Sequence, residues 1–185
     1  LFLDGLADGL EPTQALAMFF DFKELAPIGA DGDLMVRKIV RRLVDVDLLP
    51  QAAELLKYLA ENRLHGVPRA QVSTDLAVIY LMDRKPEAAL QTIDASRTTV
   101  LPTAPYAERR LIEARAWAAL GKYDSAQEII ERDTSRDGAD LRAEVTWKQK
   151  NWAVAGPLFE KALGDRWKTA TPLTSDEEGR LLRAG

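Results

Sequence analysis

Cysteine is missing from this sequence of 185 residues, and histidine occurs only once, at position 65. Without cysteine the chain has no disulfide, no thiolate nucleophile and no cysteine-ligated zinc site. A lone histidine has no second histidine or cysteine with which to bind a transition metal, so we expect His65 to be a surface residue in a turn. No G-x-x-x-x-G-K-[ST] or G-x-G-x-x-G motif is present. We therefore expect no catalytic residue and no bound cofactor.

A strong charge of one sign and a long apolar run are also missing. The chain has 25 basic and 29 acidic residues, which disfavours nucleic acid as a partner. No stretch approaches the ~18 apolar residues of a membrane-spanning helix, so we expect no membrane insertion. The first residues lack an initiating methionine and the layout of a signal peptide. We expect a fragment of a longer, bacterial-type protein, and the sequence leaves a cytoplasmic or a periplasmic location open.

What the sequence does contain is a repeated helical pattern, clearest over residues 107–133. Leu111, Ala114 and Trp117 recur at three-residue spacing, which places them on one face of a helix. After a turn at Gly121–Lys122, a second segment repeats this spacing with small and large apolar residues. These residues predict two amphipathic helices that pack together as a hairpin.

The same pattern recurs along the whole chain. Small residues of the second helix stand 37 residues apart at Ala15, Ala52, Ala89 and Ala126, and Ala155 follows 29 residues later. Four residues after each of them comes a large apolar side chain: Phe19, Leu56, Ile93, Ile130 and Phe159. Repeats of this length indicate stacked hairpins that bury their apolar faces against their neighbours. The predicted fold class is therefore all-α: a superhelix, or solenoid, of stacked antiparallel helical hairpins.

These residues resemble the tetratricopeptide repeat. One repeat is matched by Ala114, Trp117, Gly121, Tyr123, Ala126 and Ile130, and half of another by Trp152, Ala155, Phe159 and Ala162. The period is longer than that family's usual 34 residues. The resemblance implies one solenoid over residues 1–185. Its expected repeats are 1–29 (partial), 33–65, 69–98, 104–133, 138–165, and 175–185 as a cap or the start of a further repeat.

The resemblance also implies a function. In such arrays the first helices of successive pairs line a groove that binds a segment of another protein. The corresponding positions here are Arg37, Arg41, Thr74, Val78, Met82, Glu108, Leu111, Arg115, Glu144, Trp147 and Lys148. This groove would be basic at one end, apolar in the middle and mixed with acid at the other. We expect a non-catalytic scaffold for a protein or peptide partner.

Three alternatives stay open. Asp133, Ser135, Asp137 and Glu144 have the spacing of an EF-hand calcium loop, although the repeat register places Glu144 inside a helix. The chain is alternatively a helical scaffold of a larger enzyme, as in soluble superhelical transglycosylases. Self-association through the open ends of the solenoid is a third possibility.

Two further expectations concern the C-terminal part. Ser175 and Glu178 have the spacing of a capping box for a closing helix. Trp152 matches a core position of the repeat, so we expect it to be buried.

Overall fold

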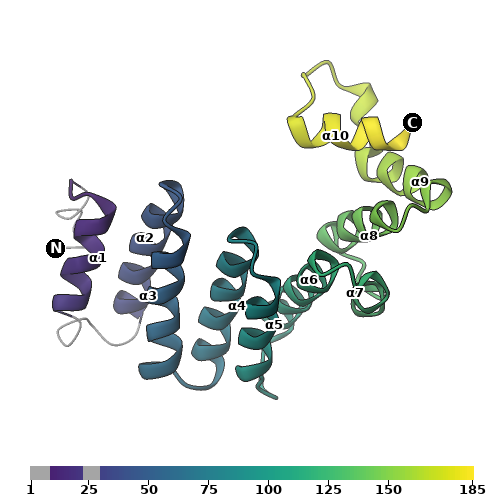
Figure 1. Ribbon diagram of the computed structural model, residues 1–185. Coiled ribbons are helices and arrows are strands. Elements are labelled where there is room, and N and C mark those ends of the chain that lie inside the picture. The colour runs from purple at the N-terminus through teal and green to yellow at the C-terminus, as the bar shows by residue number, and fades with distance from the viewer. Residues whose placement is uncertain (1–8, 23–29) are drawn as a thin grey trace.

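The computed structural model describes residues 9–22 and 30–185, and every regular element in these ranges is a helix. Figure 1 shows the helices stacked side by side along a curved path. In chain order they are α1 (Pro12–Asp21), α2 (Ala30–Asp45), α3 (Leu49–Asn62), α4 (Gly66–Met82), α5 (Pro86–Ala95), α6 (Thr103–Ala119), α7 (Tyr123–Ile130), α8 (Arg136–Lys148), α9 (Trp152–Leu163), a 3₁₀ helix (Gly164–Lys168) and α10 (Ser175–Ala184). None of the described helices is long and apolar enough to span a membrane.

Consecutive helices pack in pairs, which confirms the predicted all-α superhelix. We call α2, α4, α6 and α8 the first helices, and α3, α5, α7 and α9 the second helices. The aligned small residues Ala15, Ala52, Ala89, Ala126 and Ala155 are all 0% exposed. The large apolar residues that follow each of them by four positions are at most 3% exposed. Alanine allows the helices to approach closely, and the larger side chain fills the adjoining gap.

The turn between the two helices of a pair has the same backbone conformation in four successive pairs. Asp47, Arg84, Gly121 and Lys150 all have a left-handed backbone, with φ between 57° and 74°, and each precedes its aligned alanine by five residues. The backbone N–H of Gly121 donates to the carbonyl of Ala118 at 3.1 Å, and that of Lys122 to the carbonyl of Trp117 at 3.0 Å. Equivalent bonds close the other three turns. This is the Schellman closure of a helix C-terminus, repeated in four successive pairs.

The curvature of the stack follows from which helices touch. α4 packs against α6 and α6 against α8, whereas the described second helices make no comparable contact with one another. The first helices therefore form the inner face of the curve, and the second helices form the outer face (Figure 1).

Two expectations about the C-terminal part are wrong. The capping box of α10 uses Thr174 and Glu177, one residue earlier than expected, and Arg166 also donates to the Glu177 carboxylate at 2.8 Å. Trp152, the first residue of α9, is half-exposed and packs on one side against Trp147 of α8. Part of the expected first repeat, at 1–8 and 23–29, lies outside the described residues.

Candidate functional site

The inner face contains a cleft between α6 and α8, which we call the inner cleft. Its volume is about 220 Å³. Its floor is apolar, and its rim consists of three charged side chains. The cleft is lined by Leu81 at the end of α4, by Arg115, Ala118 and Ala119 of α6, and by Leu141, Glu144, Val145 and Lys148 of α8. Three of the predicted groove residues, Arg115, Glu144 and Lys148, thus come together here.

The charges of the inner cleft are available to a partner. Within the described residues neither Arg115 nor Lys148 has a carboxylate at ion-pair distance, and Glu144 has no cation. With two cations and one carboxylate, the rim carries a net positive charge. Because alanines form much of the floor, these long side chains stand above a shallow apolar surface.

The other end of the inner face is partly neutralised. Arg37 of α2 forms an ion pair with Asp75 of α4 at 3.1 Å, and Arg41 is exposed one turn further along α2. Burial raises the pKa of the Asp75 carboxyl, and the nearby Glu108 adds to the rise, whereas the Arg37 guanidinium opposes it. Sequence reasoning missed Asp75, although its type and its place on a first helix were visible.

Three of the predicted groove positions, Thr74, Leu111 and Trp147, have little or only partial exposure. Thr74 is 6% exposed and Leu111 is 8% exposed. Trp147 is half-buried and packs edge-on against Trp152, with the ring centroids 4.4 Å apart. The reason is helical geometry: residues four apart are offset by about 40° around the axis, so such a series drifts from one face to the next. Along α4 it begins at the buried Thr74, passes the half-buried Val78 and reaches Met82, which is 49% exposed.

Arg109, which sequence reasoning missed, joins three helices behind the inner face. Its guanidinium donates to the Ala70 carbonyl at 3.0 Å and to the Thr74 hydroxyl at 3.2 Å, both on α4. It also donates to the Ser96 hydroxyl at 2.8 Å and to the Ile93 carbonyl, at the end of α5. Burial lowers the pKa of this guanidinium, and its position at the C-terminal end of α5 favours the positive charge. The available signal was its position on one helical face with the apolar residues Ile112 and Ala116.

Two of the residues with calcium-loop spacing, Asp133 and Ser135, stabilise the start of α8. The Ser135 hydroxyl accepts the Gly138 N–H at 3.0 Å and so caps α8, and Asp133 accepts the Ser135 N–H at 2.8 Å. That bonding to Ser135 lowers the pKa of Asp133. Asp137 and Glu144 both lie on α8, about 10 Å apart along its axis, and Glu144 belongs to the inner cleft. Within the described residues no three potential ligands gather into a metal site.

Comparison of the chain with protein-family models, with curated proteins and with solved structures finds no match in any of the three.

The remaining lining residues of the inner cleft were also missed by sequence reasoning. Leu81, Ala118 and Ala119 stand three or four residues after the predicted positions Val78 and Arg115. These residues could therefore have been predicted as helical neighbours, on the same face, of the predicted groove residues.

Proposed function

We propose that the chain is a non-catalytic scaffold that binds a segment of another protein along its inner face, with the inner cleft as the main contact. The observation that carries the proposal is the combination of an apolar floor with Arg115 and Lys148, neither of which has a carboxylate partner within the described residues. Interfaces typically combine a desolvated apolar centre with charged residues at the rim.

The size and surroundings of the inner cleft favour a peptide over a small molecule. Pockets for small molecules are about 300–1,000 Å³. At about 220 Å³, the inner cleft has room for one or two side chains of a larger partner. Leu81, at the end of α4, contributes to the apolar lining, so the inner cleft reaches across three first helices. The resemblance to tetratricopeptide repeats, whose first helices line a peptide groove, supports the same assignment.

The test begins by selecting binding peptides from a displayed library against the purified chain. The affinity of a selected peptide is then measured by fluorescence anisotropy for the wild type and for Arg115→Glu/Lys148→Glu. Arg132→Glu/Lys161→Glu is the matched control, since both of its residues are exposed, lie outside the inner cleft and change the net charge equally. We expect the cleft variant to bind about tenfold more weakly and the control to bind within about twofold of wild type. Equal affinity of all three proteins would contradict the proposal.

A further inference from the structure

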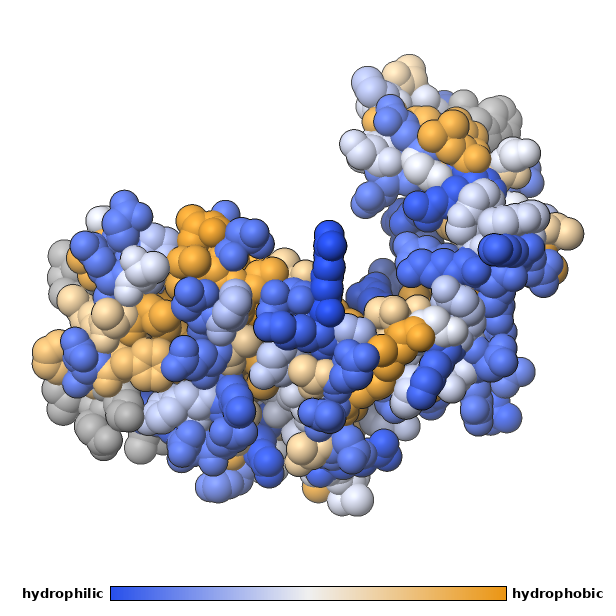
Figure 2. Space-filling view, in the orientation of Figure 1, coloured by the Kyte–Doolittle hydropathy of each residue, from blue (hydrophilic) through white to orange (hydrophobic). Residues whose placement is uncertain are grey.

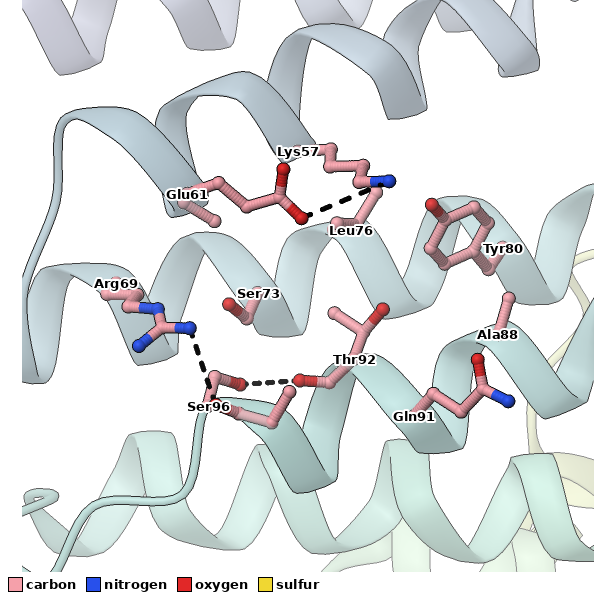
Figure 3. Close-up of a pocket in the computed structure, with 12 residues that line it drawn as sticks. Lys57, Glu61, Arg69, Ser73, Leu76, Tyr80, Ala88, Gln91, Thr92 and Ser96 are labelled. Atoms are coloured by element: carbon pink, nitrogen blue, oxygen red, sulfur yellow. Dashed lines mark hydrogen bonds and ion pairs between the residues drawn. The ribbon is translucent and has the colours of Figure 1, made fainter.

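Between α3 and α9, all within the described residues, the outer face has furrows of the same construction between successive second helices. Each second helix packs against the first helix of the next pair, and neighbouring second helices make no comparable contact with each other, so a furrow floored by a first helix remains between them. The furrow between α3 and α5 has a volume of about 240 Å³ and is shown in Figure 3. The furrow between α5 and α7 measures about 410 Å³, and the one between α7 and α9 about 670 Å³. We call the last one the outer furrow.

In the two smaller furrows most of the charged groups bind partners within the chain. Lys57 and Glu61 form an ion pair at 3.9 Å along α3, on one side of the first furrow, and Arg69 donates to the Ala95 carbonyl at 3.4 Å (Figure 3). In the second furrow Arg97 pairs with Asp94 at 2.8 Å, and Arg109 makes the buried bonds described above. Most of the charged groups in these two furrows thus have hydrogen-bond or ion-pair partners within the chain, and Glu113 of the second furrow forms no ion pair within the described residues.

The outer furrow differs, because its two walls have different chemistry. Asp124, Glu128 and Glu131 lie along the α7 wall at spacings of four and three residues, which places them in one stripe about 10 Å long. None of the three has an ion pair within the described residues. The α9 wall is apolar and consists of Leu158 and Val154, the latter 48% exposed.

The floor of the outer furrow offsets only part of the charge of the acidic wall, since one guanidinium stands against three carboxylates. Arg142 is its one cation, and its terminal nitrogen donates to the carbonyls of Ile130 and Asp133, both at 2.7 Å. Thr146 donates to the Arg142 carbonyl at 2.8 Å. The floor groups therefore have partners within the chain. On the α7 wall Asp124 accepts a hydrogen bond from the Gln149 side chain at 3.2 Å, whereas Glu128 and Glu131 have no hydrogen bond or ion pair within the described residues and remain for an external partner.

We propose that the outer furrow binds a basic amphipathic helix of a partner protein, at a surface separate from the inner cleft. Apolar side chains of that helix pack on Val154 and Leu158, and its lysine or arginine side chains pair with Asp124, Glu128 and Glu131. The choice of a helix follows from the spacing, since a helix lying parallel to α7 presents cations at the same intervals of three and four residues.

The test uses a synthetic 18-residue helix of leucine and lysine, fluorescently labelled, and a leucine–glutamate helix of equal length. Binding is measured by anisotropy at about 0.15 M salt, where long-range attraction is screened. We expect the basic helix to bind and the acidic one not to bind. Glu128→Lys/Glu131→Lys is expected to weaken binding about tenfold, and Val154→Asp to weaken it by a similar factor.

The control Glu54→Lys/Glu160→Lys changes the net charge equally at exposed positions of α3 and α9 outside the outer furrow, and is expected to bind within about twofold of wild type. Three results would overturn the proposal. One is absence of saturable binding by the basic helix. Another is equal weakening in the control, which indicates general attraction to an acidic protein. The third is a concentration-dependent dimer, seen by light scattering, that Glu128→Lys/Glu131→Lys abolishes, since the occupant is then a second copy of the chain.

Discussion

The N-terminal and C-terminal parts of the solenoid are held together differently. From α1 to α4, one continuous apolar cluster contains large side chains such as Ile39, Leu43 and Leu55. From α5 onward the apolar clusters are smaller and rich in alanine. Here side chains of arginine connect neighbouring pairs through carbonyl groups, as Arg109 and Arg142 do. Both parts thus bury apolar side chains, with the larger cluster in the N-terminal part, and although Arg42 there also donates to the Leu10 carbonyl, arginine bonds of this kind are more frequent in the C-terminal part.

This difference follows from side-chain size. Burial stabilises a fold in proportion to the apolar area removed from water, and alanine contributes much less area than leucine. A guanidinium that donates to carbonyls on two helices partly replaces that contribution. Exposed apolar side chains occur in both parts: Phe22 and Val46 are about half-exposed in the N-terminal part, and Leu181 and Leu182 of α10 are exposed at the C-terminal end. Figure 2 shows apolar surface over both parts, including over α10.

The largest expected change in stability comes from a substitution in the apolar cluster of the N-terminal part. Leu55 is fully buried there, and Leu55→Ala removes its contacts and leaves a cavity. We expect the free energy of unfolding to fall by about 3 kcal/mol in urea denaturation monitored by circular dichroism. Leu182→Ala, at an exposed position of α10, is the control and should change stability by less than about 0.5 kcal/mol. Similar losses in both variants would contradict this description of the core.

The second-largest expected effect is at Arg109, whose hydrogen bonds join the C-terminal part to the N-terminal part. Arg109→Met removes the hydrogen bonds that join α6 to α4 and to the end of α5, and we expect it to lower stability by about 2 kcal/mol. Arg109→Lys should restore only part of this loss, because a single ammonium group does not reach acceptors on both helices. Hydrogen exchange should show faster opening of α6–α9 while α2–α4 remain protected. Unchanged exchange in Arg109→Met would show that this side chain does not connect the two parts.

The third effect concerns the turn, which is the same in both parts. Arg84 and Lys150 adopt the left-handed conformation that Gly121 adopts without steric cost. We expect Arg84→Gly and Lys150→Gly each to raise stability by about 0.5–1 kcal/mol, and Gly121→Ala to lower it by about 1 kcal/mol. Thermal unfolding of the three variants measures these changes. A decrease in stability for both glycine variants would mean that the turns are not equivalent.

The smallest effect is the pH dependence of α10. The Glu177 carboxylate accepts hydrogen bonds from the Arg166 side chain and from the Thr174 N–H, and these bonds lower the pKa of Glu177 from 4.5 to about 2. Because the folded-state pKa is lowered, the stabilisation is complete above about pH 4.5 and is lost as the pH falls toward about 2. Amide NMR signals of α10 should therefore shift in this window. Glu177→Gln should lack this transition, and an identical transition in that variant would assign it to another group.

The sequence predicted the fold through its period, because alanines at fixed intervals are needed wherever equivalent helices approach closely. Ala52, Ala89 and Ala126 are fully buried in equivalent places, as the 37-residue spacing required. The predicted turn at Gly121 is confirmed as well. Residues 1–8 and 23–29, which include part of the expected first repeat, are not among the described residues.

The candidate site was less predictable than the fold. A spacing of four residues does not keep side chains on one face, so Thr74 and Leu111 are buried while Met82 and Arg115 are exposed. Arg109 carries a charge that composition assigns to the surface, and only the three-dimensional packing shows its acceptors on α4 and α5. The unequal walls of the outer furrow arise from helices that are separate in the sequence.

The most direct test of the central claim is hydrogen exchange of the chain with and without a peptide selected for binding. If the partner lies along the inner face, amide protection should increase in α4, α6 and α8, around Leu81, Arg115 and Lys148, and remain unchanged in α3, α5 and α9. Protection confined to the second helices, or spread evenly over the chain, would contradict the assignment of the inner face as the main binding surface.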